Sequence, residues 1–274
     1  MNAKPRTLGI ITNNQHNVFQ RNVLAGVREV AAQRGYTVAI DSYAEDPARP
    51  QPITLDYHAV DGVLVIANAA PNDLLQAIYE SGTPISLVSH HVPGSSIPAV
   101  ITDNAQGITE MVRYVVGECG RRSLIFVRGL PDQRDGFERE NAFRRELMRY
   151  NLPLPDDRFV PGDFSPTVAA RSIQRLLDNG TAFDAIVSAD YLMGIAAAET
   201  LRATGLRLPD DVLVVGFGDA PEAEAAGLTT VAADVVEQGR RAARQLISQI
   251  EGQRISGVTV LSVRLIVRAP CDPR

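Results

Sequence analysis

The sequence predicts an α/β protein with two lobes, each built around a parallel sheet. Short β-branched runs alternate with longer stretches of helical period along most of the chain, which is typical of βα units. A length of 274 residues and an apolar content of 45% allow a large core, and a chain of this length usually forms about two compact units. Most predicted helices also begin or end at a recognisable signal.

The first series of elements spans residues 8 to 101. Apolar, β-branched runs predict strands at 8–12, 37–40, 63–66, 85–88 and 100–101. A helix is predicted at 19–34, because one helical face carries four apolar side chains: Val23, Val27, Val30 and Ala31. A second helix is predicted at 72–81, with Asn72 as its N-cap. Gly35 and Gly82 follow these helices and are expected to end them.

A second series spans residues 104 to 217. Helices are predicted at 104–118, 139–150, 166–180 and 190–204, with strands at 124–127, 185–188 and 212–217. Ser165 and Pro166 supply an N-cap and a first-turn proline for the third of these helices. Gly120, Gly180 and Gly205 are expected to end three of them.

The last part of the chain has a different order. A strand at 231–234 leads into a helix at 235–250, and two β-rich segments follow near 258–267. This order is consistent with a chain that crosses back to the first lobe. The expected boundaries are 7–118 plus 235–252 for the N-terminal lobe, and 119–234 plus 256–268 for the C-terminal lobe. Proline-rich stretches at 47–52 and 93–98 are expected to be surface loops.

Charge and cysteine content restrict the possible functions. The net charge of −5 has the wrong sign for a surface that neutralises a phosphate backbone, so this chain alone is not expected to bind DNA. Cys119 and Cys271 are too few for a disulfide framework and lack metal-ligand spacing, so both are expected to be reduced. A polar N-terminus and the lack of a long apolar run predict a soluble, cytoplasmic protein without membrane contacts.

No catalytic pattern stands out, and we expect neither an enzyme nor a cofactor. Of the four histidines, His16, His58, His90 and His91, the last two are adjacent, and neighbours on a strand point to opposite faces. A metal site is therefore not expected. The sequence contains neither a Walker-type phosphate loop nor a Gly-x-Ser-x-Gly nucleophile motif. Arg240, Arg241 and Arg244 could contact nucleic acid, but nearby glutamates favour a solvated, salt-bridged helix face.

An ordered set of short motifs spans the chain from about residue 8 to about 268, at 8–11 with 17–19, 60–64, 102–104 with Gly107, 120–124, 162–165, 208–217, 228–231 and 239–243. Together these motifs resemble the effector-binding half of LacI/GalR-type bacterial transcription regulators. Each motif is weak alone, and their order over this length makes the resemblance specific. In that family a helix-turn-helix of roughly 60 residues precedes the first strand, where this chain has about seven residues.

The resemblance implies a periplasmic-binding-protein-like type I clamp, with two Rossmann-like lobes joined by crossover strands. It also implies a homodimer that senses a small molecule, which could be a sugar, a nucleobase or a related polar metabolite. Lobe closure would then control DNA binding by a helix-turn-helix outside this chain. Two alternatives remain: the input domain of a signalling protein with an output module after Arg274, or a sugar-binding transport receptor. The polar N-terminus argues against the receptor.

Candidate ligand-binding residues follow the predicted strands, because parallel α/β sheets bind ligands at the carboxyl ends of their strands. In the first lobe these residues are Asn13, Asn17, Phe19, Gln20, Ser89 and His90, and in the second lobe they are Arg139, Phe164, Asp190 and Asp219. Arg139 is the favoured ligand contact, because it lies where the family has an Arg-x-x-Gly-Phe motif and its guanidinium offers five donors. Phe19 and Phe164 could stack on a ligand or belong to the core.

Other interpretations of these positions stay open. Arg139 could instead be a solvated helix residue. If it is a ligand contact, its replacement by alanine is expected to weaken ligand binding at least about tenfold and to leave the melting temperature of the empty protein within a few degrees. The family often has Asp, Asn and Asp where this chain has Ser89, Ala189 and Gly218. Since an unmatched buried hydroxyl costs roughly 1 to 3 kcal/mol, these smaller residues argue against a standard monosaccharide as the effector.

Overall fold

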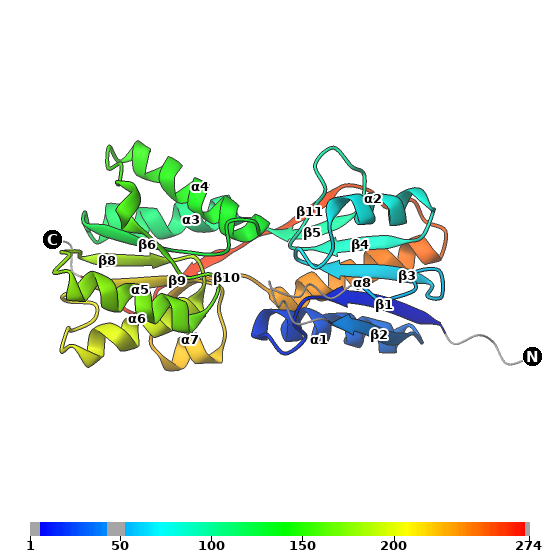
Figure 1. Ribbon diagram of the computed structural model, residues 1–274, viewed down its shortest axis with the longest axis horizontal. Helices are drawn as coiled ribbons and strands as arrows, with labels where there is room; N and C mark the ends of the chain where they lie inside the picture. Colours follow the sequence, from blue (N-terminus) through cyan, green and yellow to red (C-terminus); the bar gives the residue numbers. More distant parts are fainter. Residues whose placement is uncertain (1–5, 43–52, 272–274) are drawn as a thin grey trace, which may run out of the picture. The chain divides into compact units, whose positions relative to one another are not determined.

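The computed structural model describes residues 6–42 and 53–271. The chain forms two compact units, each with its own sheet (Figure 1). Unit 1 comprises Met1–Thr102 and Asp234–Leu261, and unit 2 comprises Asp103–Ala233 and Ser262–Arg274. The predicted proline-rich loop at 47–52 lies outside the described residues.

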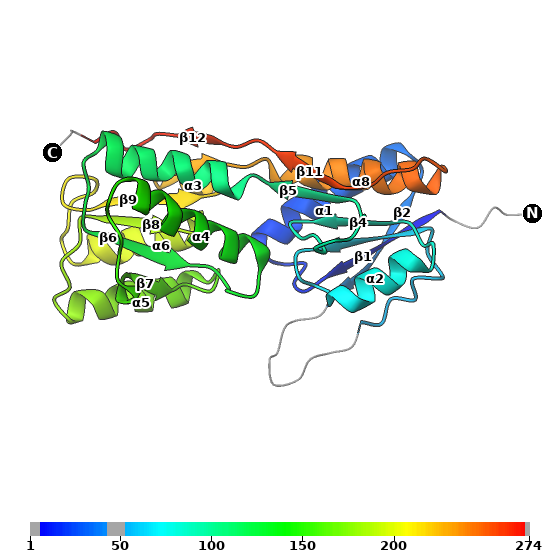
Figure 2. The same cartoon turned by 90° about the horizontal axis from the view of Figure 1, so that it is seen from above.

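Unit 1 is a parallel sheet with helices on both faces. Its strands, in spatial order, are β11 (Val258–Leu261), β5 (Ala99–Thr102), β4 (Ile85–Val88), β3 (Gly62–Ile66), β1 (Thr7–Thr12) and β2 (Thr37–Ser42), and every neighbouring pair is parallel. Helices α1 (Val18–Gln33) and α8 (Val235–Ile250) cover one face, and α2 (Asn72–Glu80) covers the other (Figure 2). Strands β3, β4 and β5 are buried along their whole length, as expected for a sheet covered on both faces.

Helices α1 and α8 approach each other at two glycines. A Cβ atom on Gly26 would overlap the backbone oxygen of Val236, and one on Gly239 would overlap the backbone oxygen of Val23. The two backbones therefore touch where side chains would normally separate them. Both glycines are buried, and alanine at either site would force the helices apart.

Unit 2 repeats the architecture with one antiparallel edge. Its strands, in spatial order, are β12 (Arg264–Ile266), β10 (Thr229–Ala232), β9 (Leu213–Phe217), β8 (Ala185–Ser188), β6 (Leu124–Arg128) and β7 (Phe159–Pro161). All neighbours are parallel except β12, which runs antiparallel to β10. Its helical segments are α3 (Asn104–Val112), the π-helix η1 (Arg113–Glu118), α4 (Arg134–Arg149), the short η2 (Asp156–Arg158), α5 (Pro166–Asp178), α6 (Tyr191–Ala203) and α7 (Pro221–Ala225).

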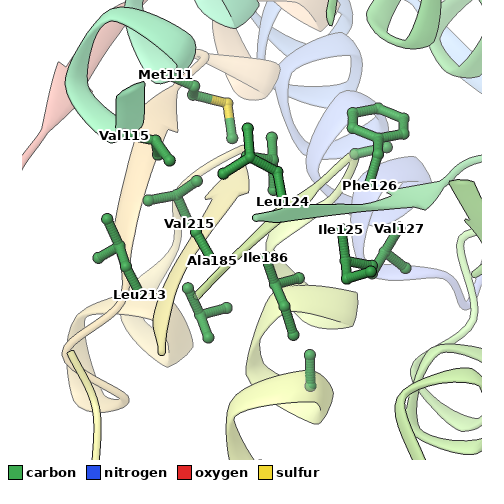
Figure 3. Close-up of a cluster of buried hydrophobic side chains, with 14 of the residues drawn as sticks. Met111, Val115, Leu124, Ile125, Phe126, Val127, Ala185, Ile186, Leu213 and Val215 are labelled. Atoms are coloured by element: carbon green, nitrogen blue, oxygen red, sulfur yellow. The ribbon is translucent and has the colours of Figure 1, made fainter. Parts of the chain in front are cut away.

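The core of unit 2 lies on both faces of its sheet. Figure 3 shows Met111 of α3 and Val115 of η1 beside apolar side chains of β6, β8 and β9. The labelled strand residues are Leu124, Ile125, Phe126, Val127, Ala185, Ile186, Leu213 and Val215, all of which are buried. Phe126 stacks on Phe143 of α4 with ring centroids 4.7 Å apart.

Most of the predicted signals for the start and end of helices are confirmed. Ser165 caps α5, where its hydroxyl accepts from the amide of Val168, and Pro166 begins the helix. Gly35 has a φ of +71° directly after α1, a conformation that favours glycine. The prediction for Asn72 is wrong, because Pro71 occupies the N-cap position of α2 and Asn72 is its first residue. The side chain of Asn72 instead contacts His90 at 2.7 Å.

The division into units differs from the predicted boundaries at two places. Residues 103–118 lie in unit 2 rather than the first lobe, because α3 packs against α4 and Asn104 hydrogen bonds to Asp135 and Glu138. Strand β11 lies in unit 1, because it pairs with β5, while β12 lies in unit 2. The last crossover therefore falls after Leu261, within a segment that was assigned wholly to the second lobe.

The prediction that both cysteines are reduced is wrong. Cys119, after η1, and Cys271, in the C-terminal segment, form a disulfide with Cα atoms 5.6 Å apart. The two residues are 152 positions apart, so sequence spacing gives no sign that the C-terminal segment returns beside η1. Within the described ranges, no helix is long and apolar enough to span a bilayer, and no cluster of His, Cys, Asp and Glu could hold a metal ion.

Candidate functional site

The candidate site of unit 1 lies at the point where the strand order reverses. Strand β1 has β2 on one side and β3 on the other, so the connections from β1 and β3 leave the sheet in opposite directions. The carboxyl ends of strands at such a reversal are where α/β sheets bind ligands. Asn13 follows β1 and Asn68 lies two residues after β3, and the Nδ2 of Asn13 is 3.5 Å from the Oδ1 of Asn68.

Buried amides and a hydroxyl form a cluster at this edge. The Oε1 of Gln20 accepts from the hydroxyl of Thr12, and its Nε2 donates to the Oδ1 of Asn13 at 2.5 Å. All three side chains are buried, so the cluster is rigid and its orientation is fixed before any ligand arrives. The sequence predicted Asn13 and Gln20, and it missed Thr12 and Asn68, whose positions at strand ends were a usable signal.

Ser89 offers a buried hydroxyl without a partner. It directly follows β4, its exposed fraction is 4%, and no hydrogen bond from another described residue reaches its Oγ. Leaving such a hydroxyl unpaired costs about 1 to 3 kcal/mol, which a ligand would recover. The φ of Ser89 is +55°, and Ala67, directly after the neighbouring β3, has the same φ. Ser89 is therefore held in a strained conformation with an available polar atom.

The other predicted residues of unit 1 have mostly structural roles. Asn17 is exposed and caps α1 by accepting from the amide of Phe19 at 2.9 Å. Phe19 packs against the core beneath α1, which supports the interpretation as a core aromatic. His90 lies at the same edge as Ser89 and pairs with Asn72.

The candidate site of unit 2 also lies at a reversal of strand order. Strand β6 has β7 on one side and β8 on the other. The guanidinium of Arg139, from α4, reaches this edge: its Nη1 donates to the backbone oxygen of Ala189, which directly follows β8, at 2.8 Å. Its Nε donates to the Oδ1 of Asn104 at 2.8 Å, and its Nη2 lies 3.6 Å from Asp135.

Arg139 is a buried residue, with an exposed fraction of 8%, and not a solvated helix arginine. Burial lowers the pKa of Arg139, and the carboxylate of Asp135 opposes this effect. Its guanidinium also lies on the ring of Phe217, the last residue of β9. Alanine at position 139 would leave buried acceptors unpaired, so the structure predicts a lower melting temperature for this variant, in place of the expected lack of effect.

Asn104 was missed by the sequence analysis, although it organises the polar groups around Arg139. Its Nδ2 donates to Asp135 at 2.8 Å and to Glu138 at 2.9 Å, while its Oδ1 accepts from Arg139. The residue is 1% exposed. It begins α3, directly after the chain enters unit 2.

Asp190 lies beside Arg139 but its carboxylate is already engaged. It caps α6, where one oxygen accepts from the amides of Leu192 and Met193 at 2.8 and 3.1 Å. Burial raises the pKa of Asp190 to about 6, against the two amides and the charge of Arg139, which favour the carboxylate. Asp190 is therefore a titratable group at the edge of the site.

Phe164 covers the carboxyl end of β6. A Cβ atom on Gly129, the first residue after that strand, would overlap the Phe164 ring. Asp163 and Phe164 have φ values of +53° and +52°, so two consecutive residues are in the left-handed region. Of the five non-glycine residues with positive φ in the described ranges, four lie beside candidate positions: Ala67, Ser89, Asp163 and Phe164. Such strain gathers at functional sites.

Asp219 is part of an ion pair. Two of its contacts come from the Arg268 guanidinium at 2.8 and 3.1 Å, and a third comes from the Thr230 hydroxyl at 2.7 Å. Arg268 and Thr230 lower the pKa of Asp219, although burial opposes them. These contacts connect the loop after β9 to the C-terminal segment and leave Asp219 poorly placed as a ligand contact.

The late basic cluster is salt-bridged, as predicted. The carboxylate of Glu237 lies 3.7, 3.1 and 3.2 Å from Arg240, Arg241 and Arg244, and Arg240 also pairs with Glu29. These arginines pair with carboxylates on α8 and α1, which favours the solvated helix face over a nucleic-acid contact.

Comparison with known proteins gives the family of this fold. The model of the periplasmic binding protein-like domain matches residues 116–271. The HTH-type transcriptional regulator CelR of Thermobifida fusca is 30% identical over 95% of this chain and 79% of its own length. The chain belongs to the LacI family of transcriptional regulators.

Solved structures of LacI-family proteins agree with this assignment. The CelR–cellobiose complex has a TM-score of 0.83 and 26% identity, covering 97% of this chain and 84% of its own. The lac repressor dimer bound to operator and the anti-inducer ONPF has the same fold, with a TM-score of 0.83, 19% identity and coverage of 98% and 95%. The predicted periplasmic-binding-protein type I fold is confirmed, and the chain is the effector-binding domain of a LacI-family regulator rather than an enzyme.

Proposed function

We propose that this domain binds its effector through the polar groups at the carboxyl ends of its strands. Ser89 carries the proposal for unit 1, because its buried hydroxyl has no partner and its backbone is strained. Arg139 carries it for unit 2, because several buried contacts fix its guanidinium at the end of β8. Asn13 and Gln20 supply further hydrogen-bond donors and acceptors at the edge of the unit 1 sheet where Ser89 lies.

The effector is a small polyhydroxylated molecule of the sugar class. Amide, hydroxyl and guanidinium groups pair with ring hydroxyls, and the unit 1 site holds several of these groups in fixed orientations. A CelR regulator that is 26% identical to this chain has been solved with cellobiose, which makes this disaccharide the first compound to test. Nucleosides are the second class to test, because Phe164 offers a partly exposed ring at the edge of unit 2.

A thermal-shift screen tests this proposal. The panel contains cellobiose, single hexoses and pentoses, sugar acids and nucleosides, each added in excess to the purified domain. A bound effector raises the melting temperature by mass action, so we expect one sugar class to stabilise the protein by several degrees. A panel in which no sugar shifts the melting temperature would remove the sugar class from the proposal.

The regulator acts as a homodimer in the cytoplasm and contacts DNA through a module that is not in this chain. The net charge of −5 supports this part of the proposal, because a negative net charge opposes binding to a phosphate backbone. The lac repressor, which shares the fold, is a dimer on its operator. Light scattering on the eluting protein should give twice the mass of one chain, and a single-chain mass would contradict the dimer.

A further inference from the structure

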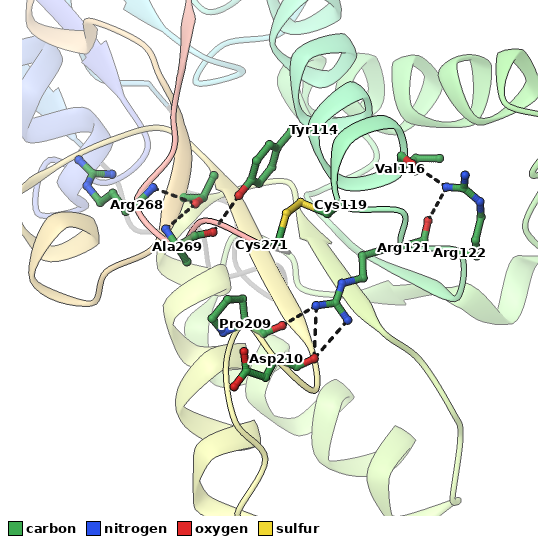
Figure 4. Close-up of a disulfide and its surroundings, with 11 residues drawn as sticks. Tyr114, Val116, Cys119, Arg121, Arg122, Pro209, Asp210, Arg268, Ala269 and Cys271 are labelled. Atoms are coloured by element: carbon green, nitrogen blue, oxygen red, sulfur yellow. Dashed lines mark hydrogen bonds between the residues drawn. A yellow bond between two sulfur atoms is a disulfide. The ribbon is translucent and has the colours of Figure 1, made fainter. Parts of the chain in front are cut away.

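The disulfide joins the buried segment around Cys119 to the more exposed C-terminal segment that holds Cys271. Cys119 is fully buried, and its amide donates to the backbone oxygen of Tyr114 at 2.9 Å. Arg121, two residues later, donates to the backbone oxygens of Pro209 and Asp210 (Figure 4). Cys271 is only partly buried and lies beyond the last strand of the sheet.

The residues before Cys271 are docked on the start of β10. The hydroxyl of Tyr114 donates to the backbone oxygen of Ala269 at 2.8 Å, and the amides of Arg268 and Ala269 both donate to the Oγ1 of Thr229 at 3.1 Å (Figure 4). Burial raises the pKa of Tyr114, as does the charge of Glu118, so the phenol keeps the proton that it donates. The disulfide attaches the end of this segment, at Cys271, to Cys119.

The contacts of this segment extend to the loop beside the candidate site of unit 2. The guanidinium of Arg268 binds Asp219 and also donates to Leu228 and Thr230 at 3.0 Å. Asp219 lies two residues after Phe217, whose ring supports Arg139. The ion pair between Arg268 and Asp219 therefore connects the segment that ends at Cys271 to the loop that follows β9.

We propose that Cys119 and Cys271 form a reversible thiol–disulfide exchange site, whose oxidation state sets how firmly residues 264–271 hold the loop at Gly218 and Asp219. This site is independent of the effector's identity. A dithiol reductant opens the disulfide between Cys119 and Cys271, and a small-molecule disulfide such as oxidised glutathione forms it again. Disulfides inside cells are usually of this exchangeable kind.

The exchange is balanced in two steps. A thiolate of the dithiol attacks the Sγ of Cys271, the more exposed sulfur, and the bond to Cys119 breaks. Cys119 leaves with the electron pair and takes up a proton, and Cys271 is held in a mixed disulfide. The second thiol of the reductant then displaces Cys271, which also takes up a proton. Two electrons and two protons have moved to the protein, and the reductant is a disulfide.

Hydrogen exchange on the full chain in its two redox states tests the proposal. The protein is equilibrated with oxidised glutathione or with dithiothreitol, and free thiols are counted after denaturation. We expect no free thiol in the first state and two in the second. Amides of 264–271 and 217–219 should exchange at least about fivefold faster in the reduced state, because docking then depends on the Arg268–Asp219 ion pair and hydrogen bonds without a covalent link. Amides of β6 should not change.

Variants separate the chemistry from folding. The double variant C119A/C271A should match the reduced protein and ignore dithiothreitol. In the single variants, glutathione disulfide should modify Cys271 of C119A at least about tenfold faster than Cys119 of C271A, since the latter sulfur is buried. Two free thiols after oxidation, equal exchange in both redox states, or faster modification of Cys119 would each overturn the proposal, and the first two results need no variant.

Discussion

The guanidinium carbon of Arg139 lies 3.9 Å from the centroid of the Phe217 ring. Phe217 ends β9, and a Cβ atom on Gly107 of α3 would overlap its ring from another direction. The ring is therefore fixed by the sheet and by α3, and it fixes the guanidinium in turn through a cation–π contact. Hydrogen bonds to Asn104 and Ala189 complete a pre-organised cation at the edge of the sheet.

Replacing Arg139 by lysine should weaken effector binding by at least about tenfold, which corresponds to about 1.4 kcal/mol. Lysine keeps the positive charge but loses the planar fork that bonds Asn104 and Ala189 together. The same loss should lower the free energy of unfolding by about 1 to 3 kcal/mol. Calorimetry gives the affinity and denaturant unfolding gives the stability. Unchanged affinity would show that Arg139 is purely structural.

Ser89 and Ser86 form a matched pair, because both are buried at the same strand of unit 1. Ser89→Ala removes an unpartnered hydroxyl, so it should leave stability unchanged or raise it, while affinity falls by about 2- to 10-fold. Ser86→Ala removes a hydrogen bond to Gln245, so it should cost about 0.5 to 1.5 kcal/mol of stability and leave affinity unchanged. The reverse pattern in unfolding and titration experiments would exclude Ser89 as a ligand contact.

Asp190→Asn should change the pH dependence of stability. The pKa of Asp190 rises from 3.8 to about 6 in the folded protein, so its proton is bound more tightly after folding. The stability contributed by the protonated form is present below about pH 4 and is lost as the pH rises through 6. Asparagine caps helices equally well and does not titrate.

The variant should therefore become more stable than the natural protein as the pH rises from 4 to 6, by on the order of 1 to 3 kcal/mol, and the difference should then stay constant up to pH 8. Thermal melts of both proteins across this range measure the difference. A stability difference that does not change with pH would show that Asp190 keeps an ordinary pKa.

Gly26→Ala should destabilise unit 1 by about 1 to 3 kcal/mol or more, because its methyl group would overlap the backbone of α8 at Val236. Ala25→Ser is the matched control, since Ala25 is exposed on the same helix. This control should melt within about 1 kcal/mol of the natural protein. Equal melting temperatures for the two variants would mean that α1 and α8 can separate at no cost.

The fold was largely predictable because periodicity and end signals act locally. The run at 85–88 and the N-cap at Ser165 depend only on nearby residues, and both appear in the structure as predicted. The unit to which α3 belongs could not be predicted from the local sequence pattern. Its assignment to unit 2 depends on Asn104 meeting Asp135 and Glu138, which lie more than 30 positions away.

The sequence predicted several positions of the candidate site, but it did not predict what each side chain does there. The rule that ligands bind at strand ends indicated Ser89 and Arg139, yet it also indicated Asn17, which caps α1, and Asp219, which binds Arg268. The disulfide shows the same limit, since its two residues are brought together by the whole of unit 2. Roles depend on partners that are distant in sequence, and Asn104 was missed for this reason.

The most direct test of the account is a calorimetric titration of the strongest sugar from the thermal-shift panel, beginning with cellobiose, into the natural protein and the Ser89→Ala and Arg139→Lys variants. The account predicts saturable binding to the natural protein and weaker binding in both variants, with Ser86→Ala unchanged. Equal affinity in all four proteins would contradict it, because the effector would then bind away from both candidate sites.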